Sequence, residues 1–182
     1  MKKVALLLAD GFEEVEVVTP ADFLRRAGIQ VVISSVGGEL VTGSNNIVIK
    51  ADSTIDALPA DLDGIILPGG MPGATNLAQS EVVTKLLNKM NNDNKLVAAI
   101  CAAPALVLGG AGLLEGRKFT CYPGFEKEVT AADFSTERVV QDGNIITSRG
   151  PGTAAEFSIA VIEYLLGSDA ANSVKEGTLQ GW

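Results

Sequence analysis

The sequence predicts an open α/β sandwich built around a mainly parallel sheet. Short apolar runs alternate with segments of helical periodicity along the whole chain. Most of these runs are apolar throughout, as expected for strands that are covered on both faces. No internal repeat, low-complexity segment or linker interrupts the 182 residues. We therefore expect one domain, 1–182, large enough to have its own core.

The strands are predicted first. The five apolar runs that we interpret as strands are 3–9, 30–36, 64–68, 95–101 and 144–148. The segment 37–52 is different, because the turn-forming residues 43–46 separate two stretches that favour β structure. This pattern predicts a β-hairpin.

The helices are predicted between the strands. Helical spacing of apolar residues is found in 13–27, 75–90 and 152–166, and a last short helix is expected over 168–177. Gly28 and Gly167 follow the first and third of these helices, where glycine favours helix termination.

The fold class itself predicts where a site would lie. Right-handed crossovers place the carboxyl ends of parallel strands at one edge of the sheet, and ligands bind there in open α/β folds. Four segments leave strands at that edge. They are 10–16, 68–74 (PGGMPGA), 101–103 and 148–153 (SRGPGT).

Composition excludes several functions. The chain has 22 acidic and 14 basic residues and a net charge of −8, without a basic run, which argues against binding to nucleic acid or to an anionic membrane surface. No apolar stretch approaches the roughly 18 residues of a membrane span. The N-terminal Lys2, Lys3 and the short run 4–9 resemble a signal peptide only briefly, because Asp10 follows. We interpret that run as a strand and expect a cytoplasmic protein.

The chain contains no histidine. This removes histidine-containing catalytic triads, Cys–His dyads and histidine-based metal sites. Chemistry must then come from cysteine, carboxylates, tyrosine, lysine, arginine or backbone amides, and we expect no metal.

Cys101 is one of only two cysteines and lies in the stretch AAICAAPA. Pro104 is tolerated only in the first turn of a helix, so the next helix is expected to start near Ala102, with its free amides beside the sulfur. This placement favours a thiolate. Alternatively, Cys101 is a small core residue at the end of a buried strand.

Helix amides alone do not suffice to ionise this thiol. Lowering a thiol pKa of about 8.5 by two units requires about 2.7 kcal/mol, whereas a helix terminus typically supplies about 0.3–1 kcal/mol. A protonated carboxyl group that donates to sulfur could add about 1.5–3 kcal/mol. The candidates are Glu13, Glu14 and Glu16, which could instead simply complement a helix N-terminus.

Four motifs resemble one family in order along the chain. LADGFEEVE, ILPGGMPGATNL, VAAICAAP and TSRGPGTAAEF together are similar to the ThiJ/PfpI superfamily, in the branch of the parkinsonism-associated protein DJ-1 and its bacterial relatives. The resemblance covers essentially the whole chain. It implies a flavodoxin-like three-layer sandwich, a domain related to class I glutamine amidotransferases, and a homodimer.

The resemblance also implies the roles of particular residues. Cys101 matches the reactive cysteine and Glu16 its partner acid. Gly69 and Gly70 match the glycine pair whose amides, with that of Ala102, form an oxyanion site. Matches of lesser specificity, to substrate-binding or supporting residues, are Tyr122, Arg26, Arg149 and Pro151.

Two departures from the family pattern bear on function. Tyr122 stands where many members have histidine, and a phenol is a poor base near neutral pH; with no histidine in the chain, peptidase and glutaminase activities are disfavoured. Asn45 stands where some members have an arginine in the hairpin, which weakens anion binding there. Cys121 precedes Tyr122 and is expected to pack into the core on the opposite side of an extended segment.

The sequence leaves three functions open. The first is a cofactor-independent glyoxalase or protein deglycase that acts on methylglyoxal and its early adducts. The second is a redox-sensing stress protein or chaperone in which Cys101 is oxidised to sulfinate. The third treats PGGMPGA as a phosphate cradle for a nucleotide or flavin, although it lacks the G-x-G-x-x-G spacing and a P-loop lysine.

Overall fold

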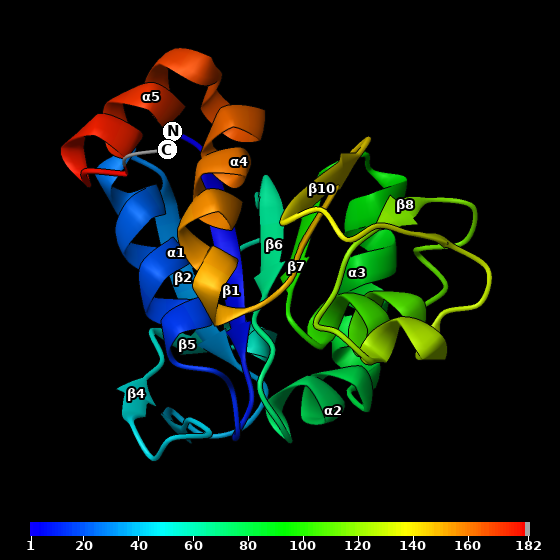
Figure 1. Ribbon diagram of the computed structural model, residues 1–182. Coiled ribbons are helices and arrows are strands. Elements are labelled where there is room, and N and C mark those ends of the chain that lie inside the picture. The colour runs from blue at the N-terminus through cyan, green and yellow to red at the C-terminus, as the bar shows by residue number, and fades with distance from the viewer. Residues whose placement is uncertain (181–182) are drawn as a thin grey trace.

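A computed structural model describes residues 1–180, so the last two residues of the expected domain lie outside the described residues. The central sheet has the strand order β10-β11-β7-β6-β1-β2-β5. All neighbours in it are parallel except β10, which pairs antiparallel with β11 at one edge. The predicted mainly parallel α/β fold is therefore confirmed (Figure 1).

The five predicted strands form the middle of this sheet. Their bounds are β1 (Lys3–Leu8), β2 (Gln30–Ser35), β6 (Gly64–Leu67), β7 (Leu96–Ile100) and β11 (Ile145–Ser148). Strands β1, β6 and β7 are buried along almost their entire length because helices cover both faces. The edge strands, which the sequence analysis missed, are β5 (Ser53–Thr54) and β10 (Val139–Asp142).

Helices form two layers, one on each face of the sheet (Figure 1). One face is covered by α1 (Val15–Arg26), α4 (Ala154–Leu166) and α5 (Ser168–Gly177). The other is covered by α2 (Gly73–Ala78), α3 (Glu81–Asn92) and the π-helix η2 (Pro104–Gly109). Each layer buries its own apolar cluster against the sheet, centred on Phe12 and Phe157 on one side and on Leu77, Leu87 and Phe119 on the other.

Smaller elements lie outside the main sheet. The predicted hairpin is present as β3 (Leu40–Thr42) and β4 (Val48–Lys50), paired antiparallel. A second small sheet contains β8 (Lys118–Phe119) and β9 (Asp133–Phe134). The 3₁₀ helices are η1 (Ile55–Ala57), η3 (Phe125–Glu128) and η4 (Pro151–Thr153).

Two helix predictions need correction. The helix expected over 75–90 is two helices, α2 and α3, because Ser80 adopts an extended conformation and caps α3 by accepting a hydrogen bond from the Val83 amide. The helix expected over 152–166 begins as the 3₁₀ turn η4, since Gly150 and Pro151 set an irregular entry. Among the described residues, no helix is both long and apolar enough to span a membrane.

Candidate active site

The four segments expected at the carboxyl edge of the sheet do meet there. The Glu13 amide donates to the Gly69 carbonyl at 3.1 Å, which joins the loop after β1 to the loop after β6. The Cys101 amide donates to the Ser148 carbonyl at 3.0 Å, and the Tyr122 amide to the Cys101 carbonyl at 2.8 Å. Backbone hydrogen bonds therefore fix the relative positions of these loops.

Cys101 occupies a sharp turn between β7 and η2. Its φ of +67° lies in the left-handed region, which is uncommon for a residue with a side chain. The first bond of the following helical segment runs from the Leu106 amide to the Ala102 carbonyl, close to the expected start, and Pro104 is in its first turn. The strained turn presents a side chain that is 8% exposed at the sheet edge.

Glu16 lies in the first turn of α1 and is fully buried. Its Oε2 accepts a hydrogen bond from the Gly69 amide at 2.7 Å. Its Oε1 accepts no hydrogen bond from nitrogen or oxygen among the described residues, and the carboxyl group has a hydrogen-bonding interaction with the Cys101 side chain. The Glu16 amide in turn donates to Glu13 Oε2 at 2.9 Å, which fixes the start of the helix. The carboxyl group is thus held by one oxygen and leaves the other free to take part in chemistry.

Gly69 connects the acid to the cysteine. A Cβ at this position would lie 2.5 Å from Cys101 Cβ and 3.0 Å from Cys101 Sγ, so only glycine permits this approach. Its amide is directed at Glu16. The expected oxyanion role of the Gly69 amide therefore needs correction, because this donor is already used by the acid.

Gly70 and Ala102 supply the amides that face the sulfur. Hydrogen bonds from both amides lower the pKa of Cys101. Gly70 has a φ of +86°, and a Cβ there would collide with the backbone of Glu13 and Phe12. These two amides are the donors that could also hold an oxyanion formed beside Sγ.

Glu16 and Cys101 influence each other's ionisation. Burial raises the pKa of Glu16 to about 7. The pKa of Cys101 is raised to about 12, mainly by burial and next by the charge of Glu16, although the hydrogen bonds from the Gly70 and Ala102 amides lower it. This direction is opposite to the expected lowering of the thiol pKa. The part of the Cys101 pKa increase that comes from Glu16 is present only while Glu16 is ionised. Near neutral pH the two groups therefore share a single negative charge, which lies either on the carboxylate or on the sulfur.

Glu14 stabilises the hairpin. Its Oε1 accepts from the Asn45 amide at 2.7 Å and its Oε2 from Asn45 Nδ2 at 2.9 Å. Although burial opposes the charge, these bonds keep the pKa of Glu14 below its usual value. Asn45 is thus occupied as a donor to Glu14, and the two residues together fix the hairpin to the start of α1.

The lesser site candidates separate into two groups. Tyr122, Arg149 and Pro151 line one surface pocket beside the cysteine turn. Arg26 does not belong to it: it lies in the last turn of α1, ten residues or about 15 Å from Glu16 along the helix axis, where Nε donates to Asp22 Oδ2 at 2.7 Å. Within one protomer Arg26 therefore does not reach this site, and its supporting role stays a prediction.

Cys121 is fully buried among apolar side chains of the opposite layer, as expected. Cys101 belongs to the apolar cluster on the other face. Both thiols are free. Burial raises the pKa of Cys121 to about 12, and this cysteine is a core residue.

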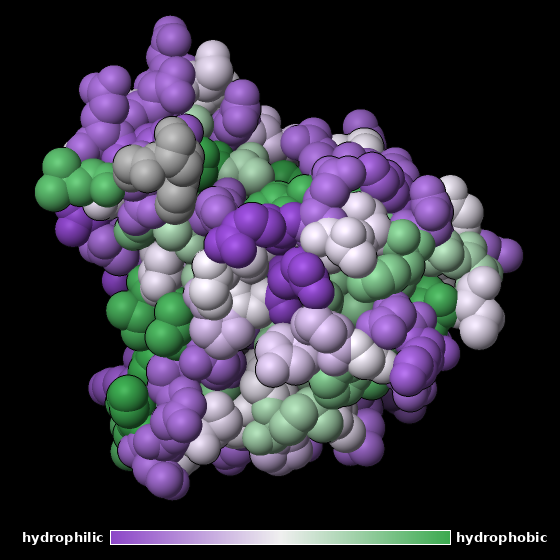
Figure 2. Space-filling model, in the orientation of Figure 1, coloured by the Kyte–Doolittle hydropathy of each residue, from purple (hydrophilic) through white to green (hydrophobic). Residues whose placement is uncertain are grey.

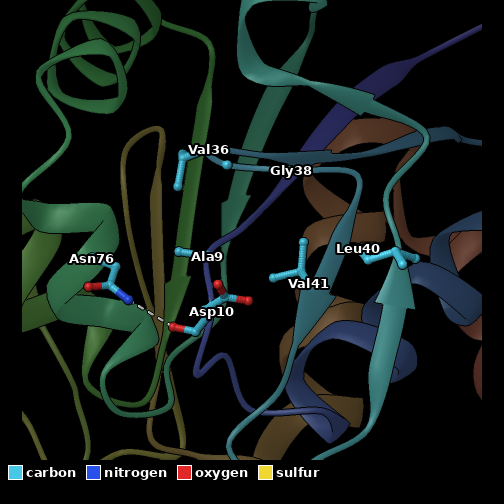
Figure 3. Close-up of a pocket in the computed structure, with 8 residues that line it drawn as sticks. Ala9, Asp10, Val36, Gly38, Leu40, Val41 and Asn76 are labelled. Atoms are coloured by element: carbon cyan, nitrogen blue, oxygen red, sulfur yellow. Dashed lines mark hydrogen bonds between the residues drawn. The ribbon is translucent and has the colours of Figure 1, made fainter.

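A separate hollow of about 190 Å³ lies where β1 and β2 end (Figure 3). Asp10 and Asn76 give it a polar side, and the Asn76 Nδ2 donates to the Asp10 carbonyl at 2.9 Å. Val36, Leu40 and Val41 line the rest. Neither Cys101 nor Glu16 lines it, so it is distinct from the reactive pair.

Two features of the site were missed by the sequence analysis. Ser148 Oγ and Thr153 Oγ1 lie 2.7 Å apart and are buried, and the Gly150 amide donates to Thr153 Oγ1 at 3.1 Å. These hydrogen bonds hold the 149–152 loop in place. Both hydroxyl-bearing residues belong to the motif SRGPGT. Arg138, the residue before β10, lines the surface pocket that also contains Tyr122 and Arg149. No local sequence pattern distinguishes this arginine from the others. No group of three or more metal-ligating side chains occurs within residues 1–180.

Comparisons with known proteins agree with this fold. The model of the DJ-1/PfpI family matches residues 2–164. The chain is 40% identical over 180 residues to the Parkinson disease protein 7 homolog of Danio rerio, covering 96% of this chain and 95% of that protein. It is 44% identical over 176 residues to Protein DJ-1 homolog B of Arabidopsis thaliana, where the match covers 95% of this chain but only 40% of the plant protein.

A third relative and one solved structure complete the comparison. A protein of Pyrococcus abyssi that is named a deglycase is 33% identical over 153 residues, covering 82% of this chain and 91% of that protein. The structure of oxidized Toxoplasma gondii DJ-1 superposes with a TM-score of 0.95 at 40% identity and covers 98% of both chains.

Proposed function

This chain belongs to the DJ-1/PfpI family, and from that premise we propose that it is a cysteine-dependent glyoxalase and protein deglycase that needs no cofactor. The single observation that supports this most is the joint placement of Cys101 and Glu16 by Gly69 at the edge of the sheet. The deglycase name of the archaeal relative supports the substrate class, methylglyoxal and its early adducts.

We propose that the single charge of the pair rests on sulfur. Two amides, of Gly70 and Ala102, donate to Sγ, whereas the Glu16 carboxylate accepts one amide, that of Gly69, and otherwise a hydrogen bond from the Cys101 thiol itself. A buried anion is stabilised more strongly the more hydrogen bonds it accepts. When Oε1 is protonated, it donates a hydrogen bond to the thiolate and thereby gains a partner. Glu16, with a pKa near 7, readily takes up that proton.

The reaction proceeds from this state. Cys101 Sγ attacks the aldehyde carbon of methylglyoxal, and the resulting alkoxide is held by the Gly70 and Ala102 amides and protonated by Glu16, which gives a hemithioacetal. The Glu16 carboxylate then removes the proton from that carbon, which gives an enediol as the hydroxyl proton passes to the neighbouring, former ketone oxygen. Glu16 returns its proton to the neighbouring carbon, so that the ketone becomes an alcohol and the hemithioacetal a thioester. Water hydrolyses the thioester, which releases lactate and restores Cys101.

Lactate formation from methylglyoxal tests the proposal. The wild type should form lactate, Cys101→Ser should form none above the uncatalysed rate, and Glu16→Gln should lose at least about 100-fold because its proton transfer is gone. Cys121→Ser, a change at the buried core cysteine, is the matched control and should retain activity. No lactate from the wild type, or undiminished lactate from Cys101→Ser, would refute the enzyme.

A second candidate function uses the same sulfur. We propose that peroxide oxidises Cys101 through sulfenate to sulfinate, with one peroxide reduced to water in each step, as expected of a redox-responsive stress protein or chaperone. The oxidized form of the Toxoplasma gondii relative favours it. Intact-mass analysis after mild peroxide should show two added oxygens on Cys101; oxygen appearing first on Cys121 would contradict this role.

We propose that the protein acts as a cytoplasmic homodimer. Val15 and Val18 of α1 and Ile47 and Val48 of the hairpin are each about half exposed, and α1 and the hairpin are joined through Glu14. Figure 2 shows apolar side chains gathered over these two elements. The free thiols fit a reducing compartment, and the net charge of −8 disfavours nucleic acid as a partner.

A further inference from the structure

The hollow where β1 and β2 end takes no part in the mechanism above (Figure 3). Its volume is about 190 Å³. It lies at the carboxyl ends of two parallel strands, the end at which open α/β folds bind their ligands. Because neither Cys101 nor Glu16 lines it, a ligand in the hollow would not compete with a substrate at the reactive pair.

Most of the wall of this hollow is apolar. Ala9 and Val41 are almost fully buried, and Val36 and Leu40 complete the apolar part. The rim at 37–38 is open, because a Cβ at either glycine there would meet nothing within 4 Å. A small hydrocarbon body that enters the hollow therefore leaves water on several sides, which favours its binding.

The one charged side chain of the wall is Asp10. Figure 3 shows its carboxylate between Ala9 and Val41. One oxygen, Oδ1, accepts a hydrogen bond from the Thr42 amide at 2.9 Å. Within residues 1–180 no lysine or arginine pairs with this carboxylate. It therefore keeps both a negative charge and acceptor capacity for a ligand.

Hydrogen bonds hold Asp10 in this position. The hairpin contacts it through the Thr42 amide, and the Gly11 amide donates to the Thr42 carbonyl at 2.8 Å. From α2, Asn76 Nδ2 donates to the Asp10 carbonyl at 2.9 Å. The loop after β1, the hairpin and α2 are thus joined at this residue. Because the carboxylate is already in place, its ordering costs little when a ligand binds.

We propose that this hollow binds a small organic cation, with a primary ammonium group on Asp10 and a short aliphatic body against Val36, Leu40 and Val41. An ammonium group carries three donors and forms strong hydrogen bonds to a carboxylate. The net charge of −8 also attracts cations and repels anions. A calcium ion fits less well, since it needs six or more oxygen ligands and most of this wall is apolar. The site does not depend on the proposed function.

Three ligands with the same five-carbon chain test the site in the wild type: n-pentylammonium, 1-pentanol and pentanoate. In an amide ¹H–¹⁵N titration at pH 7 and constant ionic strength, pentylammonium should shift the signals of 10–11 and 36–42 saturably. Pentanol should bind at least about tenfold more weakly, because it lacks the charge-assisted hydrogen bond. Pentanoate should show no saturable shift. Equal affinities for pentylammonium and pentanol would overturn the proposal without the need for any variant.

Variants then assign the charge that the ligand recognises. Asp10→Asn keeps an acceptor for the Thr42 amide and should weaken pentylammonium binding by about tenfold, with pentanol binding unchanged. Asp56→Asn, a change at an exposed aspartate of η1 outside the hollow, is the matched control and should bind as the wild type does. An unchanged pentylammonium affinity in Asp10→Asn would overturn the proposal.

Two further titrations identify the source of the ammonium and separate this site from the reactive pair. Nα-acetyl-lysine N-methylamide presents the same group on a polypeptide unit. If it binds more tightly than pentylammonium, the ligand is a lysine side chain of a polypeptide; if more weakly, it is a free amine. Cys101→Ser should bind pentylammonium with wild-type affinity, whether or not the protein forms lactate. A loss of binding in Cys101→Ser would contradict a separate site.

Discussion

Cys101 shows how much of the site is decided by single residues. A proline three positions later limits where the helix can start, and the positive φ of Cys101 aims its sulfur at the amides of Gly70 and Ala102. Glu16 comes from another element, α1, and is held beside Cys101 through the Gly69 amide. The turn at Cys101 was predictable from AAICAAPA, whereas the pKa of its thiol was not, because it depends on burial and on a carboxyl group 85 positions earlier in the chain.

The raised pKa of Glu16 makes stability depend on pH. A carboxyl group with a pKa of about 7 in the folded state and 4.5 as its ordinary value binds its proton more tightly when folded. It therefore stabilises the fold below about pH 4.5, and this contribution is lost as pH rises to about 7. The shift corresponds to about 3 kcal/mol.

Urea unfolding at several pH values measures this effect. The free energy of unfolding of Cys101→Ser, minus that of the double variant Cys101→Ser with Glu16→Gln, should fall by about 3 kcal/mol between pH 4.5 and pH 8, because Glu16 then titrates without the thiol and the amide does not titrate. The subtraction removes the contributions of carboxyl groups that both proteins share. A difference that stays constant or rises with pH would show that Glu16 is not a buried acid of raised pKa.

At the scale of elements, glycines determine how closely the loops approach. Gly69 has no positive φ, so its replacement is opposed by close contacts, with the Cys101 side chain and with the Ala102 backbone nitrogen, and not by backbone strain. Gly69→Ala should cost about 1–3 kcal/mol of stability and slow iodoacetamide alkylation of Cys101, because the added methyl group displaces the sulfur from its amide donors. Gly37→Ala is the matched control, since nothing lies within 4 Å of a Cβ there. Equal alkylation rates in the two variants would contradict the close approach.

The break between α2 and α3 concerns stability alone. Ser80→Ala removes the side-chain acceptor for the Val83 amide and should lower the free energy of unfolding by about 1 kcal/mol. It should leave the alkylation rate of Cys101 at the wild-type value, because α3 is remote from the reactive pair. Ser80→Asp, which restores an acceptor, should recover most of the stability in urea unfolding. A loss of alkylation in Ser80→Ala would show unexpected coupling between this helix and the site.

At the scale of the whole molecule, the exposed apolar patch on α1 and the hairpin is the surface through which we propose that two copies associate. Sedimentation velocity at micromolar concentration should show a dimer for the wild type and a monomer for Val18→Lys combined with Val48→Lys, because both lysines would place charge in the proposed interface. Val82→Lys, an equally exposed valine on α3, is the control and should remain dimeric. A monomeric wild type would contradict the proposed homodimer.

Much of this architecture was predictable because the signals are local. Apolar runs such as 64–68 give the central strands, and the turn residues 43–46 give the hairpin. The fold class then brings Cys101, Glu16 and the 148–153 loop to one edge. What the sequence could not predict depends on neighbours in space: Gly69 donates to Glu16, Arg26 pairs with Asp22 away from the site, and Arg149 donates to the Thr136 carbonyl.

The account depends most on where the single charge of the Cys101–Glu16 pair lies. Thiolate absorbance at 240 nm, recorded against pH with Cys101→Ser subtracted, measures this directly. Burial raises the pKa of Cys101, and the account requires the Gly70 and Ala102 amides together with a protonated Glu16 to outweigh it. We therefore expect a thiolate midpoint below that of a free thiol, about 8.5, and shifted by no more than about one unit in Glu16→Gln. A midpoint far above 8.5 that falls steeply in Glu16→Gln would place the charge on the carboxylate and contradict the account.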